Sequence, residues 1–231
     1  MTLTRRLIIV AISELLFVVA TRVVIHYFPW TSVEAESIRT ALRIGTALLY
    51  WWLLKPVILS RTPDLPSLKS PAVLLALLAF LTIPVLVGHY ELASNVAILF
   101  AVTSLAVAIK EEFLFRGIMQ NLLADRFGAL KAIFITNLVF TAWHIGTWEP
   151  SIWTFSQIFF AGVLLSLIYL RTGSIMAVIV LHTVYDAIFS FTPLISPPLN
   201  ENWGFIPLLG SVALAAYWAL GNKAGIKHNT D

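Results

Sequence analysis

Long runs of apolar residues recur along the whole chain of 231 residues, and short polar or proline-containing stretches separate them. About 20 helical residues cross the roughly 30 Å hydrocarbon core of a bilayer, and most of the runs are near that length. Within that core, helices and closed barrels alone pair all of their backbone groups. The pattern therefore predicts eight helical segments, approximately 7–27, 40–60, 71–89, 93–123, 129–147, 153–171, 174–194 and 203–220.

The breaks between these segments contain proline, which lacks a backbone N–H and restricts the residue before it. Examples are Phe28-Pro29-Trp30, Thr62-Pro63-Asp64-Leu65-Pro66 and Ser196-Pro197-Pro198. The first segment follows Arg5 and Arg6 but has no clear cleavage site, and we expect it to be retained. The predicted fold is an all-α polytopic membrane protein, one bundle over residues 1–231.

Composition narrows the class of protein further. Apolar residues make up 59% of the chain and charged residues 12%, about half of what a soluble domain carries. This excludes a soluble domain, a disordered chain and a nucleic-acid-binding protein. The net charge of +3 is explained by basic residues facing the cytoplasmic leaflet. The absence of cysteine excludes disulfides, thiolate metal sites and a cysteine nucleophile.

Basic residues also predict how the bundle lies in the membrane, since short loops rich in Lys and Arg stay in the cytosol. Most basic residues fall at one set of segment ends: Arg5, Arg6, Lys55, Arg61, Lys69, Arg126, Lys131, Arg171, Lys223 and Lys227. The opposite ends hold Arg22, Arg39 and Arg43 together with Glu34, Glu36, Glu91, Glu149 and Glu201. We therefore expect both termini in the cytosol of an integral membrane protein.

The fourth segment contains a charged run, Lys110-Glu111-Glu112-Phe113-Leu114-Phe115-Arg116. A charge near mid-bilayer costs about 2.5–3.5 kcal/mol on insertion scales, so a group of them marks a functional site or a tightly paired cluster. Glu112 and Arg116 are four residues apart on one helical face and are predicted to form an ion pair. Glu111 points about 100° away from Glu112 and needs a partner of its own.

Two histidines within apolar segments could supply that partner. His144 shares a helical face with Phe140, and His182 shares one with Asp186. Glu111 lies 17 residues before Gly128, the expected turn, and His144 lies 16 after it, so the two are predicted at equal depth, about 25 Å from that turn. His182, counted from Thr172, falls about 10 Å short unless the end at 125–126 protrudes into the cytosol.

A carboxylate and an imidazole at equal depth suit activation of water for hydrolysis. Glu111 would accept the proton and His144 would position the water, in the cytosolic half of the membrane. His182 and Asp186 would stabilise an oxyanion or hold a metal. Two histidines and two carboxylates (Glu111, His144, His182 and Asp186) could also ligate zinc, and the residues leave both chemistries open.

At these positions the chain resembles the CPBP family of CAAX proteases and bacteriocin-processing enzymes, which includes the type II CAAX prenyl endopeptidases. The family's EExxxR appears at 111–116, its FxxxH at Phe140 to His144, and its HxxxN or HxxxD at His182 to Asp186. These motifs lie in a core of about 93–194. The resemblance implies an eight-helix intramembrane endopeptidase, labelled a metalloprotease although a metal-free glutamate mechanism is also argued, in a bacterial or archaeal cell membrane.

The resemblance also implies functions for single residues and a class of substrate. Glu111 and His144 would activate water, His182 and residue 186 would assist the oxyanion, and Glu112, Arg116 and Phe140 would support the site. The substrate would be a membrane-embedded or lipidated peptide or protein, with prenylated CAAX proteins as one class. Position 186 is Asp where the prenyl endopeptidases carry Asn, and an ionised Asp cannot donate to an oxyanion.

Two functions without proteolysis remain open. A proton-coupled transporter could use the same charged residues as a relay, although the chain lacks matched Gly- or Pro-broken helices in two halves. A non-catalytic immunity or scaffold protein could retain the fold. Other intramembrane proteases are excluded because the sequence contains neither HExxH nor GxSG.

Overall fold

The structure is a computed structural model that describes residues 2–88, 92, 94–145, 151–192 and 198–221. All regular secondary structure among the described residues is helical. The α-helices are α1 (Leu3–Tyr27), α2 (Val33–Ile58), α3 (Pro71–Val87), α4 (Ser94–Glu112), α5 (Asn121–Phe127), α6 (Ala129–Trp143), α7 (Ile152–Thr172), α8 (Ile175–Ser190) and α9 (Glu201–Gly221). A short 3₁₀ helix, η1 (Leu65–Lys69), precedes α3, and a π-helix, η2 (Phe113–Gln120), joins α4 to α5 without a break.

Apart from η1, the described residues thus contain eight continuous helical segments, because α4, η2 and α5 form one of them. This confirms the predicted all-helical membrane fold. By length and apolar composition, α1, α2, α7 and α9 are candidate membrane spans, and α3, α6 and α8 are shorter apolar helices.

The second helix starts earlier than predicted, and this places Glu36 inside the helix. The second helix begins at Val33 rather than near residue 40, because the Ser32 hydroxyl accepts from the Ala35 N–H at 3.1 Å and caps it. Glu36, expected in a loop, is therefore buried in the helix, where Oε1 accepts from Arg43 Nη1 at 2.6 Å and from the Thr103 hydroxyl at 2.7 Å.

Two glycines shape the connections on either side of the motif-bearing helices. Gly128 has a φ of +81° and ends α5 where the sequence places the turn, and Gly173 has a φ of +60° between α7 and α8. Both conformations favour residues without a Cβ. These turns return α6 beside η2 and α5, and α8 beside α7 and α4.

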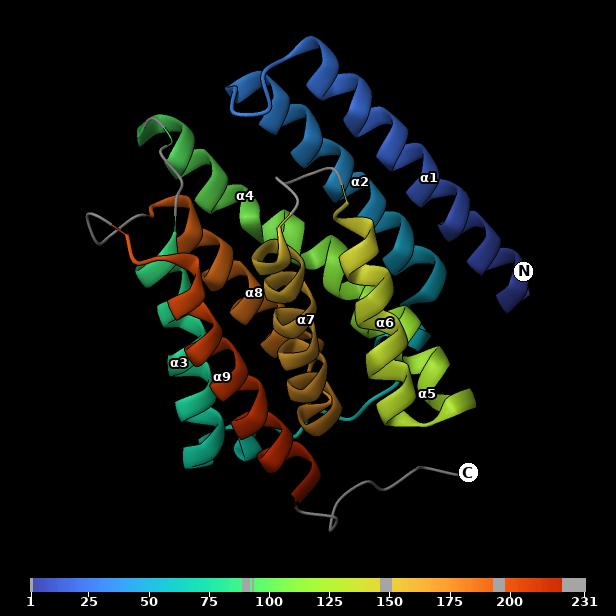
Figure 1. Cartoon of the computed structure of the whole chain (residues 1–231). Coiled ribbons are helices and arrows are strands. Elements are labelled where there is room, and N and C mark those ends of the chain that lie inside the picture. The colour runs from blue at the N-terminus through green and yellow to red at the C-terminus, as the bar shows by residue number, and fades with distance from the viewer. Residues whose placement is uncertain (1, 89–91, 93, 146–150, 193–197, 222–231) are drawn as a thin grey trace.

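The arrangement places α4 inside the bundle and α1 at its edge (Figure 1). α4 packs between α2 and α8, while α3 pairs with α9 and α7 packs against α6, α8 and α9. α1 packs on α2 and exposes a broad apolar surface, as expected of a helix that faces lipid. The charged run of the fourth segment is consequently surrounded by other helices.

Candidate active site

The motif-bearing helix changes its winding directly after the paired glutamates. Glu111 and Glu112 end α4, and the π-helix η2 starts at Phe113 and carries Arg116. π-helical turns are rare and occur frequently at functional sites. The π-helical turns therefore begin directly after the two glutamates of the charged run.

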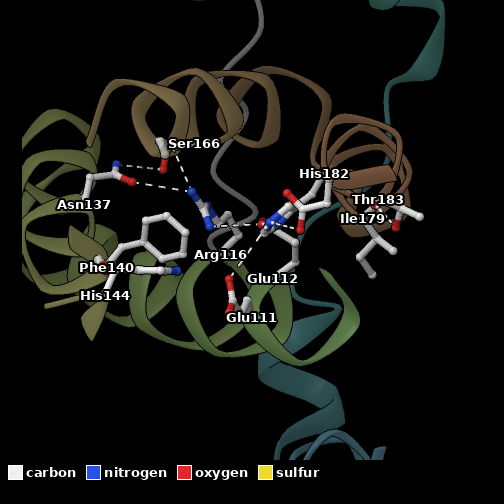
Figure 2. A network of polar contacts seen from close by, with 12 residues as sticks. Glu111, Glu112, Arg116, Asn137, Phe140, His144, Ser166, Ile179, His182 and Thr183 are labelled. Atoms are coloured by element: carbon white, nitrogen blue, oxygen red, sulfur yellow. Dashed lines mark hydrogen bonds and ion pairs between the residues drawn. The ribbon is translucent and has the colours of Figure 1, made fainter. Parts of the chain in front are cut away.

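The predicted ion pair between Glu112 and Arg116 is confirmed. Glu112 Oε1 lies 3.0 Å from Arg116 Nη1, and both side chains are fully buried. Arg116 Nη2 donates to the Gly162 carbonyl at 2.9 Å and to Asn137 Oδ1 at 3.4 Å. The guanidinium also lies 4.8 Å from the centre of the Phe140 ring, a cation–π contact. Arg116 thereby joins η2 to α6 and α7 (Figure 2).

His182, on α8, brings the carboxylates together. Its Nδ1 lies 2.7 Å from Glu112 Oε1, and its Nε2 lies 3.4 Å from Asp186 Oδ2 and 4.0 Å from Glu111 Oε2. Glu112 Oε1 therefore accepts from both Arg116 and His182. The structure gathers Glu111, Glu112, Arg116, His182 and Asp186 into one group. Figure 2 shows the first four of these side chains pointing toward one another.

The 10 Å mismatch in depth expected for His182 is absent, since its Nε2 lies 4.0 Å from Glu111 Oε2. The Asn121 side chain donates to the Tyr169 hydroxyl at 2.9 Å and joins the start of α5 to the last turn of α7. Counting residues from the two turns thus misjudged the depth of α8 relative to α4. The protrusion of residues 125–126 into the cytosol stays a prediction.

His144 lies at the C-terminal end of α6. Its Nδ1 is 2.8 Å from the Phe140 carbonyl oxygen, and the two rings meet edge to face at 4.6 Å. A carbonyl can only accept, so Nδ1 carries the proton and Nε2 of the neutral ring is an acceptor. These contacts place His144 against Phe140, which itself touches Arg116, while the meeting of His144 with Glu111 stays a prediction.

Exposure shows which side of the group is accessible. The side chains of Glu112 and Arg116 are 0% exposed, whereas those of Glu111 and Asp186 are 13% and 32% exposed. Water or substrate would therefore approach from the side of Glu111 and Asp186.

The described residues do not fit a zinc site. No group of three or more His, Cys, Asp and Glu side chains within the described ranges is arranged to hold a metal ion. The predicted set of Glu111, His144, His182 and Asp186 is thus not arranged as four ligands.

Sequence reasoning missed the polar groups of α6 and α7 that surround Arg116. The Asn137 amide accepts from Arg116 and donates to Ser166 Oγ at 3.0 Å, and Gly162 supplies its carbonyl. A signal was present, since Asn137 lies one turn before Phe140 in an apolar helix. Polar residues spaced by three or four in such a helix point to its buried face.

Residues 93–188 match the family model described as type II CAAX prenyl endopeptidase Rce1-like. This range contains all three motifs and the residues of the group just described. The matched stretch of this chain is therefore similar to the Rce1-like family. The match confirms the resemblance found in the sequence, and the Rce1-like family implies an intramembrane protease that acts on a membrane-associated peptide. No curated protein and no solved structure matches the chain.

Proposed function

We propose that this chain is an endopeptidase that cleaves near the C-terminus of a membrane-anchored or lipidated peptide or protein, using water activated by Glu111. The observation that supports this most directly is the position of Glu111, a partly exposed carboxylate 4.0 Å from His182 Nε2 at the open side of a buried charge cluster. A general base must reach its water, and Glu111 is placed to do so whereas Glu112 is enclosed.

In this mechanism the Glu111 carboxylate takes a proton from water, and the oxygen attacks the carbonyl carbon of the scissile peptide bond. The C–O bond forms as the carbonyl becomes an oxyanion. When that intermediate collapses, the C–N bond breaks and the Glu111 carboxylic acid returns the proton to the leaving amine. The products are a new carboxyl terminus and a free amine.

His144 is proposed to orient the attacking water. Its Nδ1–H donates to the Phe140 carbonyl, so Nε2 is the ring nitrogen that would accept a hydrogen bond from water in the neutral tautomer. Phe140 in turn packs on Arg116, which ties the imidazole to the charged group.

His182 is proposed to stabilise the oxyanion from the opposite side. Glu112 accepts from Nδ1, so Nε2 can donate only when the ring is protonated. A protonated ring would offset part of the charge of Glu111, Glu112 and Asp186, which Arg116 alone does not balance. Asp186 orients His182 in this scheme and does not replace the donating amide of an Asn.

The test is a cleavage assay on purified protein with a membrane-anchored peptide that the native chain cleaves, the cut bond being read by mass spectrometry. We expect Glu111→Gln to lower kcat at least about 100-fold, and His144→Ala and His182→Ala about 10- to 100-fold. Glu34→Gln, at an exposed position in the first turn of α2, is the matched control and should retain activity.

Each assay is run with and without a chelator. Activity that survives chelation and depends on Glu111 agrees with the proposal. Full activity of Glu111→Gln, or loss with chelator that zinc alone restores, would contradict it.

A further inference from the structure

A second buried charge lies directly behind the proposed site and has no part in the mechanism above. Lys110 is 1% exposed, and its Nζ lies 2.8 Å from Glu14 Oε2. The hydroxyl of Tyr50, also buried, donates to the other oxygen of Glu14. The ammonium is therefore held by α1 and, through Tyr50, by α2.

Two aromatic rings face the same ammonium. Lys110 Nζ lies 4.1 Å from the centre of the Phe17 ring and 4.8 Å from that of Trp143. Both distances are within the range of a cation–π interaction, which strengthens where water is excluded. Trp143 is the last residue of α6, so the ammonium joins α4 to the end of that helix.

The positions of these residues in the sequence give the cluster its significance. Lys110 immediately precedes Glu111, and Trp143 immediately precedes His144. Adjacent Cα atoms are about 3.8 Å apart, so the Lys110–Trp143 contact fixes backbone that also carries the two proposed water-activating residues.

Stability alone does not account for an ion pair here. Replacing a buried ion pair by apolar residues of similar volume is often neutral or stabilising, because both ions must be desolvated. α1 lies at the edge of the bundle, and Ser13 is the one polar residue beside Glu14 between Leu7 and Ala20, so apolar side chains could attach this helix equally well.

We propose that Lys110, held in place by Glu14 and Tyr50, is a positioning residue that sets the location of His144 relative to Glu111 through the Trp143 ring. This inference rests on the proposed function, in which Glu111 activates the attacking water and His144 orients it. Lys110 does not touch the water or the substrate in this scheme; it acts through the ends of α4 and α6.

The first test removes the charges but keeps the volume. The triple variant Glu14→Leu, Tyr50→Phe, Lys110→Met should unfold within a few degrees of the native protein. We expect its kcat to fall at least tenfold while KM changes less than about twofold, since a misplaced catalytic group slows chemistry without removing substrate contacts. A native-like kcat in this folded variant would overturn the proposal.

Two substitutions of Trp143 test whether its aromatic ring is needed. Trp143→Phe keeps an aromatic face for the ammonium and should retain most of kcat, whereas Trp143→Leu should lose at least about fivefold. Equal kcat in these two variants, at equal melting temperature, would show that the ring acts only by packing and would also overturn the proposal.

A measurement independent of activity separates this inference from the proposed function. The chain has no cysteine, so His144→Cys gives a single thiol whose rate of maleimide labelling reports its surroundings. Combining the three substitutions of the triple variant with His144→Cys should change the labelling rate at least threefold. An unchanged labelling rate would contradict the positioning role of Lys110. If Glu111→Gln keeps full activity while the labelling rate changes, the proposed function fails and the positioning of residue 144 stands.

Discussion

Glu112 is the residue on which the charged group depends, because one of its oxygens serves two donors. Oε1 accepts from Arg116 at 3.0 Å and from His182 at 2.7 Å, and the whole Glu112 side chain is buried. Oε2 has no hydrogen-bond partner among the described residues. A buried carboxylate is tolerated here because a cation and an imidazole share its charge.

Arg116→Met should therefore be strongly destabilising. The change leaves Glu112 buried without its cation, and breaking a buried pair in this way costs about 3–5 kcal/mol. Thermal unfolding in detergent would measure the loss. Arg171→Met is the matched control, since its partner Asp64 lies 3.8 Å away and is 49% exposed, and such pairs contribute about 0–1 kcal/mol. Equal losses of stability in the two variants would show that the buried pair of Glu112 and Arg116 contributes no more than the exposed one.

The sequence predicted the partners within one helix better than those between helices. The pair of Glu112 with Arg116 follows from spacing alone, because positions four apart share a helical face. The contact of Glu112 with His182 does not, since it depends on how α8 is rotated and shifted against α4. Lys110 likewise belonged to the recognised charged run, but its partner Glu14 is 96 residues away in an apolar helix.

At the scale of elements, the continuous helix of α4, η2 and α5 determines the depth of the site. From Ser94 to Phe127 it measures about 50 Å, well beyond a 30 Å hydrocarbon core. Apolar length predicted the eight segments, because crossing a bilayer sets a minimum for each. It could not predict the π-helix, which packs on α2 and α6 and leaves no periodic trace in the sequence.

The close approach of α6 and α7 around Arg116 depends on Gly162. A Cβ at this position would lie 2.3 Å from Asn137 Oδ1 and 3.2 Å from a Phe140 ring carbon. Gly162→Ala should consequently displace two side chains that contact Arg116, and we expect kcat to fall at least tenfold with a loss of about 1–3 kcal/mol in stability.

The control for this substitution is Gly210→Ala in α9, where an added Cβ meets nothing within 4 Å. That change should leave kcat unaltered and stabilise the helix by about 0.5–1 kcal/mol, the usual gain of alanine over glycine within a helix. Cleavage rates and melting temperatures of the two variants measure both expectations. Full activity in Gly162→Ala would argue against a role for this contact in placing the site.

For the whole molecule, the charges divide the bundle into two unlike ends. The end formed by α5 and the α7–α8 turn carries Arg126 and Arg171, and Arg61 adds a cation over the Tyr169 ring at 5.5 Å. The other end, where α2 begins, holds Glu36 in a cluster with Arg39 and Arg43, so its basic residues are paired within the bundle. We infer that the first end faces the cytosol, since basic loops are retained there.

This orientation can be tested with single cysteines, because the native chain contains none. Asp125 on α5 and Glu34 in the first turn of α2 are both exposed. The start of α2 and α5 lie at opposite ends of the bundle (Figure 1). A membrane-impermeant maleimide added to intact cells should label Glu34→Cys, and should label Asp125→Cys only after the membrane is opened. The reverse labelling pattern would mean that the bundle has the opposite orientation in the membrane. Glu111, about 21 Å along the helix from residue 125, would then be approached from the other side of the membrane midplane.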